Sequence, residues 1–340
     1  MPHARAKFVA LARREQWRYH MDQDDCVTID VDSDRERKVL LELAAALTRL
    51  ESDATRALLK PAGVSLSPSD FARVTSLTQL AALDDAAWLV NLLTEGRLRS
   101  EYQPIVHADD PTKVFAHEAL ARGTDLDGSV VPPVRLFGAA RDAGLLFQLD
   151  LAARRSAIDG AHRHAIRERL FVNFTPTAIY DPATCLRSTA RAVSQAGLVP
   201  DYVIFEVVES EKTTDTKHLR AILDRYRADG FKVALDDVGA GYSSLNLIHQ
   251  LRPDFIKLDM ELTRGVHADP FKALVAAKVL EIAQELSIQT VVEGVEVVEE
   301  LEWAQEHGAT YAQGYLFARP QSEPVRAIDP SRIGMALAAV

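Results

Sequence analysis

The chain has 340 residues, of which 47% are hydrophobic and 26% charged, a composition typical of a globular protein with a sizeable core. Its net charge of −10 disfavours DNA and anionic membranes as partners, and no apolar run reaches the roughly 18 residues of a membrane span. The first residues lack a signal-peptide core, so we expect a cytoplasmic protein in which Cys26 and Cys185 are reduced.

Residues 1–95 are expected to form a helical N-terminal region, and two roles stay open for it: regulation or dimerisation, or packing that only adds stability. In "VDSDRERKVLLELAAALTRL", Ser33 and Glu36 predict a capping box at the start of a helix. An apolar stripe follows at helical spacing, formed by Val39, Leu40, Leu43, Leu47 and Leu50. The stretch "DDAAWLVNLLTEGRL" predicts one further helix that stops at Gly96.

From residue 96 to 325, short β-rich runs alternate with helical segments. Eight runs are expected as strands, at 101–106, 114–122, 170–176, 202–210, 231–239, 254–260, 290–296 and 311–320. This number and spacing predict an α/β fold, a TIM-like (β/α)8 barrel. The connection 107–113 is too short for a parallel crossover, so the first strand is expected to be antiparallel. Residues 326–340 are expected to form a C-terminal tail.

Polar residues recur inside these runs or toward their carboxyl ends, where a barrel gathers its active-site groups. They are Glu118, Asn173, Glu206, Asp236, Asp237, Lys257, Glu293 and Gln313. Any single one could cap a helix or pair with a neighbour. The set favours a site, because five carboxylates at one barrel mouth would repel one another unless cations neutralised them.

Two adjacent acids, Asp236 and Asp237, end the run "FKVALDD". Neighbouring residues of a strand point to opposite faces, so both can serve one site only where the backbone turns. Such a pair suits a binuclear site, and oxygen ligands with one amide favour Mg²⁺ or Mn²⁺ over zinc. The following "GAGYSS" is a partial dinucleotide-binding fingerprint, but the paired acids would repel a pyrophosphate there.

At these positions the sequence resembles the EAL-domain phosphodiesterases that hydrolyse cyclic di-GMP. The resemblance covers about residues 85 to 322 and includes the tripeptide Glu118-Ala119-Leu120 within "HEALAR". The motifs "YQPIV", "NFTP", "EVVES", "DDVGAGYSSL", "DFIKLDM", "EGVE" and "QGY" occur in family order. The resemblance implies an enzyme that opens one ester bond of cyclic di-GMP to give linear pGpG.

The resemblance also assigns roles to individual residues. The ligands of two Mg²⁺ or Mn²⁺ ions would be Glu118, Asn173, Glu206, Asp236 and Asp237. Glu293, close to the second ion, would act as general base, while Lys257 would position the attacking water. Substrate contacts would come from Gln103, Glu118, Leu120, Arg122 and Gln313, and Glu209 would anchor the loop from Val238 to Ser244. The expected assembly is a homodimer.

The sequence departs from the family pattern at Val208, Val238 and Ala240, which affects the loop after the paired acids. The catalytic set is complete, so an active enzyme is the favoured prediction. Two alternatives remain open at this stage: a non-catalytic cyclic di-GMP receptor that acts through protein contacts, and a protein-binding module that acts through the N-terminal helices.

Overall fold

The computed structural model describes residues 2–21, 26–32, 35–64, 66–179, 181–208, 216–239 and 244–334. They form two compact units. One contains the described residues up to Glu95 together with Val134–Leu149, and the other contains Gly96–Pro133 and the described residues from Asp150 onward. Within these ranges, no helix is long and apolar enough to cross a lipid bilayer.

The N-terminal unit combines short helices with two small antiparallel strand pairs. Its helices are α1 (Pro2–Arg14), α2 (Glu36–Ala45), α3 (Arg49–Ala54), α4 (Leu77–Asp85) and α5 (Ala87–Thr94), joined by most of α6 (Pro133–Ala143). Strand β1 (Arg18–Met21) pairs with β2 (Val27–Asp30), and β3 (Arg56–Ala57) pairs with β4 (Thr75–Ser76). The strand pairs were not predicted, because the sequence indicated helices only.

Two details of the predicted N-terminal helices differ in the structure. Val39, Leu40, Leu43 and Leu47 are buried, but Leu50 is 82% exposed. The stripe ends because α2 stops at Ala45 and a new helix begins after Thr48, which forms a capping box with Glu51. Ser33 lies outside the described residues, and Arg35 occupies the N-cap position of α2 without a side-chain cap.

The helix predicted before Gly96 is α5, which begins at Ala87, while Asp84 and Asp85 at the start of the predicted stretch end α4. Gly96 directly follows the C-cap of α5 and has a φ of 67°, the left-handed conformation that commonly ends a helix.

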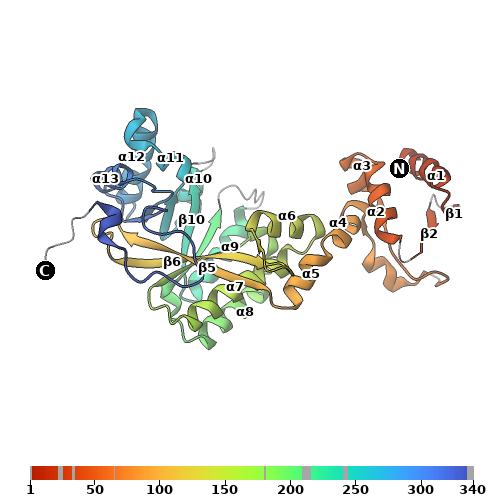
Figure 1. Cartoon of the computed structure of the whole chain (residues 1–340), viewed down its shortest axis with the longest axis horizontal. Helices are drawn as coiled ribbons and strands as arrows, with labels where there is room; N and C mark the ends of the chain where they lie inside the picture. Colours follow the sequence, from red (N-terminus) through yellow and green to blue (C-terminus); the bar gives the residue numbers. More distant parts are fainter. Residues whose placement is uncertain are drawn as a thin grey trace. The chain divides into compact units, whose positions relative to one another are not determined.

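The second unit is a closed barrel of eight strands (Figure 1). The strands are β5 (Leu98–His107), β6 (Val114–Thr124), β8 (Arg169–Asn173), β9 (Val203–Val208), β10 (Lys232–Val238), β11 (Phe255–Leu258), β12 (Gln289–Val292) and β13 (Tyr311–Gln313). Strand β5 is antiparallel to β6 and to β13, and all other barrel neighbours are parallel. The predicted eight-stranded barrel with an antiparallel first strand is therefore confirmed.

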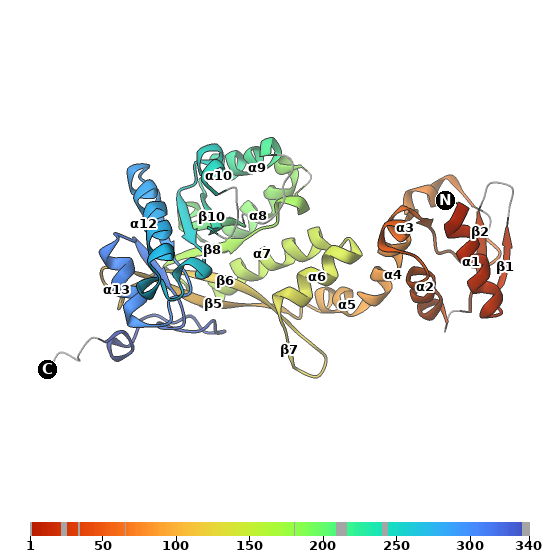
Figure 2. The same ribbon diagram turned by 90° about the horizontal axis from the view of Figure 1, so that it is seen from above.

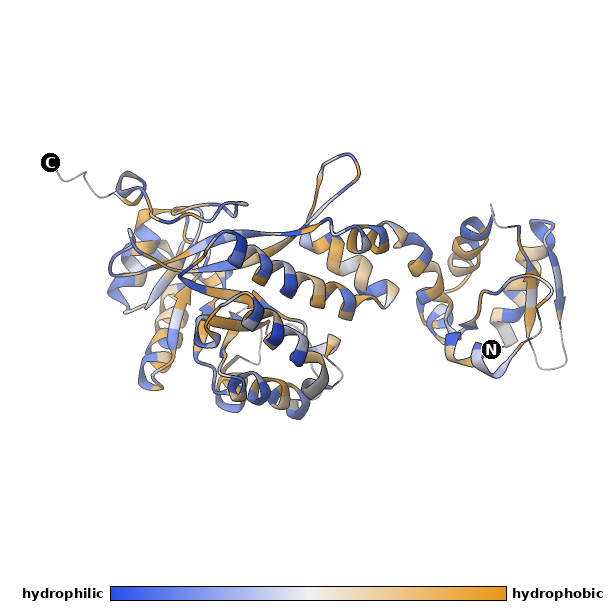
Figure 3. Ribbon diagram, turned by 90° about the horizontal axis from the view of Figure 1, so that it is seen from below, coloured by the Kyte–Doolittle hydropathy of each residue, from blue (hydrophilic) through white to orange (hydrophobic). Residues whose placement is uncertain are grey.

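Strand β7 (Val130–Val131) pairs only with the end of β6, and this hairpin extends beyond the other barrel strands (Figure 2). The remaining helices of the chain are α7 (Leu146–Arg163), α8 (Pro182–Gln195), α9 (Thr216–Ala228), α10 (Ser244–Leu251), α11 (Met260–Thr263), α12 (Pro270–Glu285) and α13 (Val298–Glu306). The long ones carry both hydrophobic and hydrophilic residues (Figure 3), as expected for helices with one face against the sheet.

One layer of apolar side chains closes the barrel interior. Its members come from all eight strands: Ile105, Phe115, Ala116, Phe171, Ile204, Ala234, Phe255, Val291 and Tyr311. Phe115 and Tyr311 stack with their ring centroids 3.7 Å apart, and Phe171 meets Phe255 edge to face. The barrel is thus a packed core at this level and not a pore.

Candidate active site at the carboxyl ends of the barrel strands

A polar layer lies directly above the apolar layer of the barrel. On each parallel strand, the polar residue stands two positions after the inward-facing apolar residue, as in Ala234 and Asp236, or Phe255 and Lys257. Because side chains alternate with a period of two, these polar residues also face the barrel interior. The layer consists of Gln103, Glu118, Asn173, Glu206, Asp236, Lys257, Glu293 and Gln313.

Lys257 lies at the centre of this polar layer. Its ammonium group is 2.6 Å from Glu293 Oε1 and 3.0 Å from Glu206 Oε1. It is also 3.3 Å from Asp236 Oδ1 and 3.4 Å from Glu118 Oε2. One buried cation therefore faces four carboxylates, which leaves the layer short of positive charge.

Amide side chains hold Glu118 from two sides. Asn173 Nδ2 donates to Glu118 Oε1 at 3.0 Å, and Gln313 Nε2 donates to Glu118 Oε2 at 2.7 Å. Gln313 Nε2 also contacts Gln103 Oε1 at 3.2 Å, and Gln103 donates to the carbonyl oxygen of Ala318. Gln313 Oε1 is buried and accepts no hydrogen bond from the described residues.

Asp236 and Asp237 reach the same site through a distortion within β10. The strand continues to Val238, within the predicted run 231–239, so the backbone turns inside the strand and not at its end. Its register against β11 shifts between Leu235 and Val238, and Asp237 has a φ of 56°. This left-handed residue turns both side chains to one side. Carboxylate oxygens of Asp236, Asp237 and Glu293 then lie within 4.8 Å of one another.

The shortage of positive charge around these acids raises the pKa of several of them. Burial raises the pKa of Glu206 and of Glu293 well above the ordinary value, and the charge of Lys257 offsets only part of this effect. Burial together with the charges of Asp236 and Asp259 raises the pKa of Asp237 to about 7. Burial acts the same way on Glu118, but Lys257 and the two amides outweigh it and lower its pKa. Additional cations would stabilise the ionised acids.

The residues present fit a divalent metal centre. Both carboxylate oxygens of Glu206 are buried; Oε1 contacts the Lys257 ammonium at 3.0 Å, and Oε2 has no hydrogen-bond partner among the described residues. A buried carboxylate without hydrogen-bond donors is costly unless a cation binds it. The donor set is carboxylate oxygen with one amide, which suits a hard cation such as Mg²⁺ or Mn²⁺.

The loop that carries Glu293 is fixed by a buried acid that was not among the predicted site residues. Glu300 accepts hydrogen bonds from the backbone nitrogens of Gly265, Glu296 and Val297. At Gly314, a Cβ atom would lie 1.9 Å from the carbonyl oxygen of Val295, so only glycine fits beside this loop. These contacts fix the loop that carries Glu293 against the residues that follow Gln313.

Asp259 is a second residue that was missed in the sequence. It interacts with the Asp237 carboxylate and caps α11 by accepting from the backbone nitrogen of Glu261 at 2.7 Å. Its position two residues after Lys257, on the same face of the chain, was the available signal. We expect it to help orient Asp237.

The other predicted site residues lie apart from Lys257 or outside the described part of the chain. Leu120 and Arg122 follow Glu118 along β6, and Arg122 bonds Glu101 at 3.0 Å. Val238 is buried at the end of β10. Glu209 and Ala240 lie outside the described residues, so the predicted loop anchor stays a prediction.

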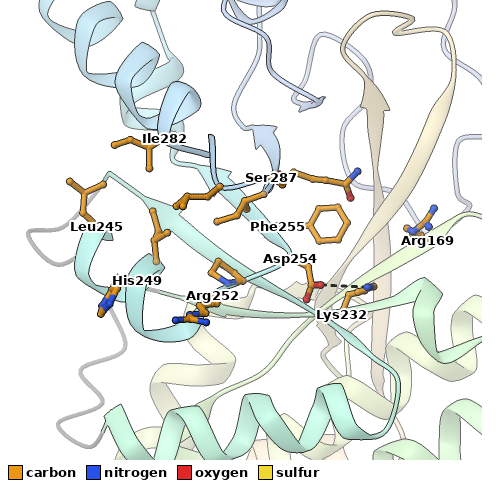
Figure 4. A pocket seen from close by; sticks show the side chains of 14 residues that line it. Arg169, Lys232, Leu245, His249, Arg252, Asp254, Phe255, Ile282 and Ser287 are labelled. Carbon is orange, nitrogen blue, oxygen red and sulfur yellow. Dashed lines mark ion pairs between the residues drawn. The ribbon is translucent and has the colours of Figure 1, made fainter. Parts of the chain in front are cut away.

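A cavity of about 800 Å³ lies at the opposite end of the barrel (Figure 4). Lys232 and Gln289, which begin β10 and β12, line it together with Phe255 of the apolar layer. Leu245, His249 and Arg252 reach it from α10 and its end. The apolar layer separates this cavity from Lys257, so it does not belong to the polar site.

Comparison with known proteins places this geometry in a family. The EAL domain family matches residues 82–320. The cyclic di-GMP phosphodiesterase NbdA of Pseudomonas aeruginosa is 30% identical over 276 residues, which are 77% of this chain and 35% of NbdA. The chain therefore spans about a third of that relative's length.

Two solved structures share the fold. A standalone EAL protein from Vibrio cholerae in its c-di-GMP-bound form is 32% identical, with a TM-score of 0.62, 69% of this chain covered and 97% of that chain. Klebsiella pneumoniae BlrP1 in a manganese and cyclic di-GMP complex is 34% identical, with a TM-score of 0.60 and coverages of 68% and 57%. With its eight-stranded barrel, its polar layer and a family match over most of its length, this chain belongs to the EAL domain family.

Proposed function

We propose that this protein is a metal-dependent phosphodiesterase that hydrolyses cyclic di-GMP to linear pGpG. The observation that carries the proposal is the polar layer in which one buried lysine faces four carboxylates, three of them buried and that of Glu293 partly buried. Such a layer is short of positive charge, and metal cations with an anionic phosphodiester would complete it. Relatives at about 30% identity that are named cyclic di-GMP phosphodiesterases support this substrate.

Two divalent cations, Mg²⁺ or Mn²⁺, would be held by residues from four strands. These are Glu118, Asn173, Glu206, Asp236 and Asp237, with Glu293 beside them. When bound, such ions supply Lewis-acid activation of water and neutralise charge on the phosphodiester. The unpartnered Oε2 of Glu206 and the clustered oxygens of Asp236, Asp237 and Glu293 support this ligand set.

The chain's own groups would bind the substrate and move the proton. Glu293 would take a proton from the attacking water at its carboxylate, and Lys257 holds Glu293 in place through the 2.6 Å contact. A bond forms between the water oxygen and phosphorus, one ester bond breaks, and the proton passes to the leaving ribose oxygen. Gln313 Oε1 and the side chains of Gln103, Leu120 and Arg122 would orient the dinucleotide.

The alternative is a receptor that binds cyclic di-GMP without cleaving it and acts through protein contacts. The completeness of the polar layer favours the enzyme, because a receptor needs neither a general base nor a lysine beside it. As part of the same proposal, we expect the protein to act as a homodimer.

Incubation of the protein with cyclic di-GMP and Mg²⁺ or Mn²⁺ tests the proposal. We expect pGpG to form, and we expect a chelator or Glu118→Ala to stop its formation while the fold is retained. Ca²⁺ prefers longer bonds, about 2.3–2.6 Å, and is expected to permit binding without cleavage. Binding without cleavage in any metal would instead identify a receptor.

A further inference from the structure

The cavity of about 800 Å³ at the end of the barrel opposite Lys257 takes no part in the proposed reaction (Figure 4). Its volume lies within the range of roughly 300–1,000 Å³ that is usual for small-molecule sites in proteins. Residues of α10 and of the end of α12 form its walls, together with the first residues of β10, β11 and β12. All of these elements belong to the barrel unit, so one compact unit supplies the whole cavity.

Large apolar side chains line this cavity. Ile248 and Phe255 are 3% and 2% exposed and form its buried wall. Leu245 near the start of α10 and Leu286 after the end of α12 also line it, yet they are 57% and 56% exposed. Contact of such side chains with water is unfavourable, and an apolar ligand in the cavity would replace that contact. The cavity therefore favours a ligand with an apolar body.

The charged groups on one side of the cavity balance one another. Lys232 lies 3.5 Å from Asp201 and 3.5 Å from Asp254. Arg169 lies 3.7 Å from the same Asp201, so two cations face two acids. This side therefore has little net charge with which to attract a ligand.

The charges near the end of α10 are not balanced. Arg252 is exposed, and it forms no ion pair with any residue that the structure describes. Arg227 brings a second guanidinium to this end, where its Nη2 donates to the carbonyl oxygens of Leu251 and Arg252 at 2.7 and 2.8 Å. Asp224 lies 3.3 Å from Arg227 and compensates one of the two charges. In a chain with a net charge of −10, this local excess of positive charge beside an apolar cavity indicates an anionic ligand.

The backbone of Arg252 supports a use for its side chain. The residue directly follows the last residue of α10 and has a φ of 46°, a left-handed conformation. This position commonly holds glycine, which adopts that conformation without strain. Because an arginine there is strained, its side chain and not its backbone accounts for the residue.

We propose that this cavity binds a small amphipathic anion, with its carboxylate at Arg252 and an aliphatic body against Leu245 and Leu286. A planar guanidinium matches the two oxygens of a carboxylate, and the imidazole of His249 is a further polar group in the lining beside it. The site shares no residue with the polar layer, so this inference goes beyond the proposed function and does not depend on it.

Titration calorimetry on the full chain, without metal or dinucleotide, compares the binding of decanoate and decylammonium. The two probes have the same aliphatic chain and opposite charges. The negative charge of the whole protein would by itself favour the cation, so a preference for decanoate has to come from the cavity. We expect one saturable decanoate site per chain, with an affinity at least about tenfold higher than that for decylammonium.

Substitutions of Arg252 test the head-group contact. Arg252→Gln should lower the decanoate affinity about tenfold and remove most of the preference. Arg252→Gly should do the same with the fold retained, because glycine suits a φ of 46°. Arg155→Gln is the matched control, because it removes an exposed arginine that is paired with Asp159 on α7, and it should leave both affinities unchanged.

Leu286→Ala tests the apolar wall. It should weaken the binding of both probes several-fold, because both lose the same apolar contact, whereas Leu50→Ala, at an 82% exposed leucine of the N-terminal unit, should weaken neither.

Three results would overturn the proposal. The first is a wild type without saturable decanoate binding, and the second is a preference for decanoate that survives both Arg252 variants. Light scattering checks the third, which is a dimer that binds no decanoate and that Leu286→Asp dissociates. That result would assign the cavity to a second copy of the chain.

Discussion

Lys257 determines the charge balance of the polar layer. Its side chain is 1% exposed and contacts four carboxylates, three on other strands and that of Glu293 directly after β12. Burial alone would lower the pKa of this lysine, but the surrounding acids outweigh that effect and raise it well above the ordinary value. The residue is therefore charged at neutral pH and serves as the one fixed cation among the contacts described for these acids.

Lys257→Met should destabilise the protein most strongly when no metal is available. Uncompensated buried charge costs about 3–5 kcal/mol, so we expect the free energy of unfolding in EDTA to fall by about that amount. Mn²⁺ should restore part of the loss, because a bound cation compensates the same acids. Denaturant unfolding with and without Mn²⁺ measures both quantities. Lys278→Met, at an exposed lysine, is the control, and a loss independent of Mn²⁺ would contradict the assignment.

Helix α7 offers a direct comparison between a buried and an exposed ion pair. Asp150 and Arg154 are 2% and 0% exposed, and Asp150 Oδ1 also accepts from the backbone nitrogen of Thr175 at 2.7 Å. This bond ties the helix to the loop that follows Asn173. Arg155 and Asp159 form the exposed pair on the same helix.

We expect Asp150→Asn to cost about 3–5 kcal/mol, because it leaves the buried Arg154 without its counter-ion. Asp159→Asn should cost less than about 0.5 kcal/mol. Chemical denaturation of the two variants under identical conditions gives both values. Equal losses would show that the buried pair has no special structural role.

At the scale of elements, the stability contributed by the N-terminus of α3 depends on pH. Hydrogen bonds from Lys7 and from Thr48 lower the pKa of Glu51 to about 2, against an ordinary value of 4.5. A folded-state pKa below the unfolded one means that ionised Glu51 stabilises the fold above about pH 4.5. That contribution disappears as the pH falls toward 2.

Glu51→Gln should therefore lower the melting temperature of the N-terminal unit at neutral pH. The difference from the wild type should narrow as the pH is lowered from about 5 toward 3, because wild-type Glu51 also loses its charge. Thermal melts at a series of pH values check this. Asp53→Asn, at an exposed acid on the same helix, is the control variant for these melts.

The barrel elements were predictable from the sequence, whereas several details of the site and of the N-terminal unit were not. Apolar runs that end in polar residues mark buried parallel strands, and the short segment before Val114 required an antiparallel pair. The adjacent acids Asp236 and Asp237 indicated a backbone turn, but the bulge inside β10 that makes the turn had no sequence pattern. The contacts of Lys257 with four acids depend on barrel closure and had none either. Strands β1 (RYHM) and β2 (VTID) alternate polar and apolar residues, but each has only four residues, the shortest run for which alternation predicts a strand.

For the whole molecule, every described residue assigned to the site belongs to the barrel unit. The N-terminal unit has a separate core in which Leu43 is buried. Each unit therefore has the packing needed for its own unfolding transition.

We expect scanning calorimetry to resolve two unfolding transitions, one for the N-terminal unit and one for the barrel unit. Mn²⁺ with a bound dinucleotide should raise the midpoint of the barrel transition only, because a ligand stabilises the unit that binds it. Leu43→Ala should lower the other midpoint, through a loss of about 2–5 kcal/mol. A single transition, or a shift of both midpoints with Mn²⁺, would contradict independent units.

The account depends most on the claim that the carboxylates around Lys257 hold the catalytic metals. Mn²⁺ binding by titration calorimetry, followed by cyclic di-GMP turnover on the same samples, tests it most directly for wild type and Asp236→Asn. We predict about two Mn²⁺ per wild-type chain. For the variant we predict loss of at least one ion and turnover reduced at least about 100-fold, with the fold retained. Wild-type turnover in the variant, or wild-type cleavage without any divalent cation, would contradict the account.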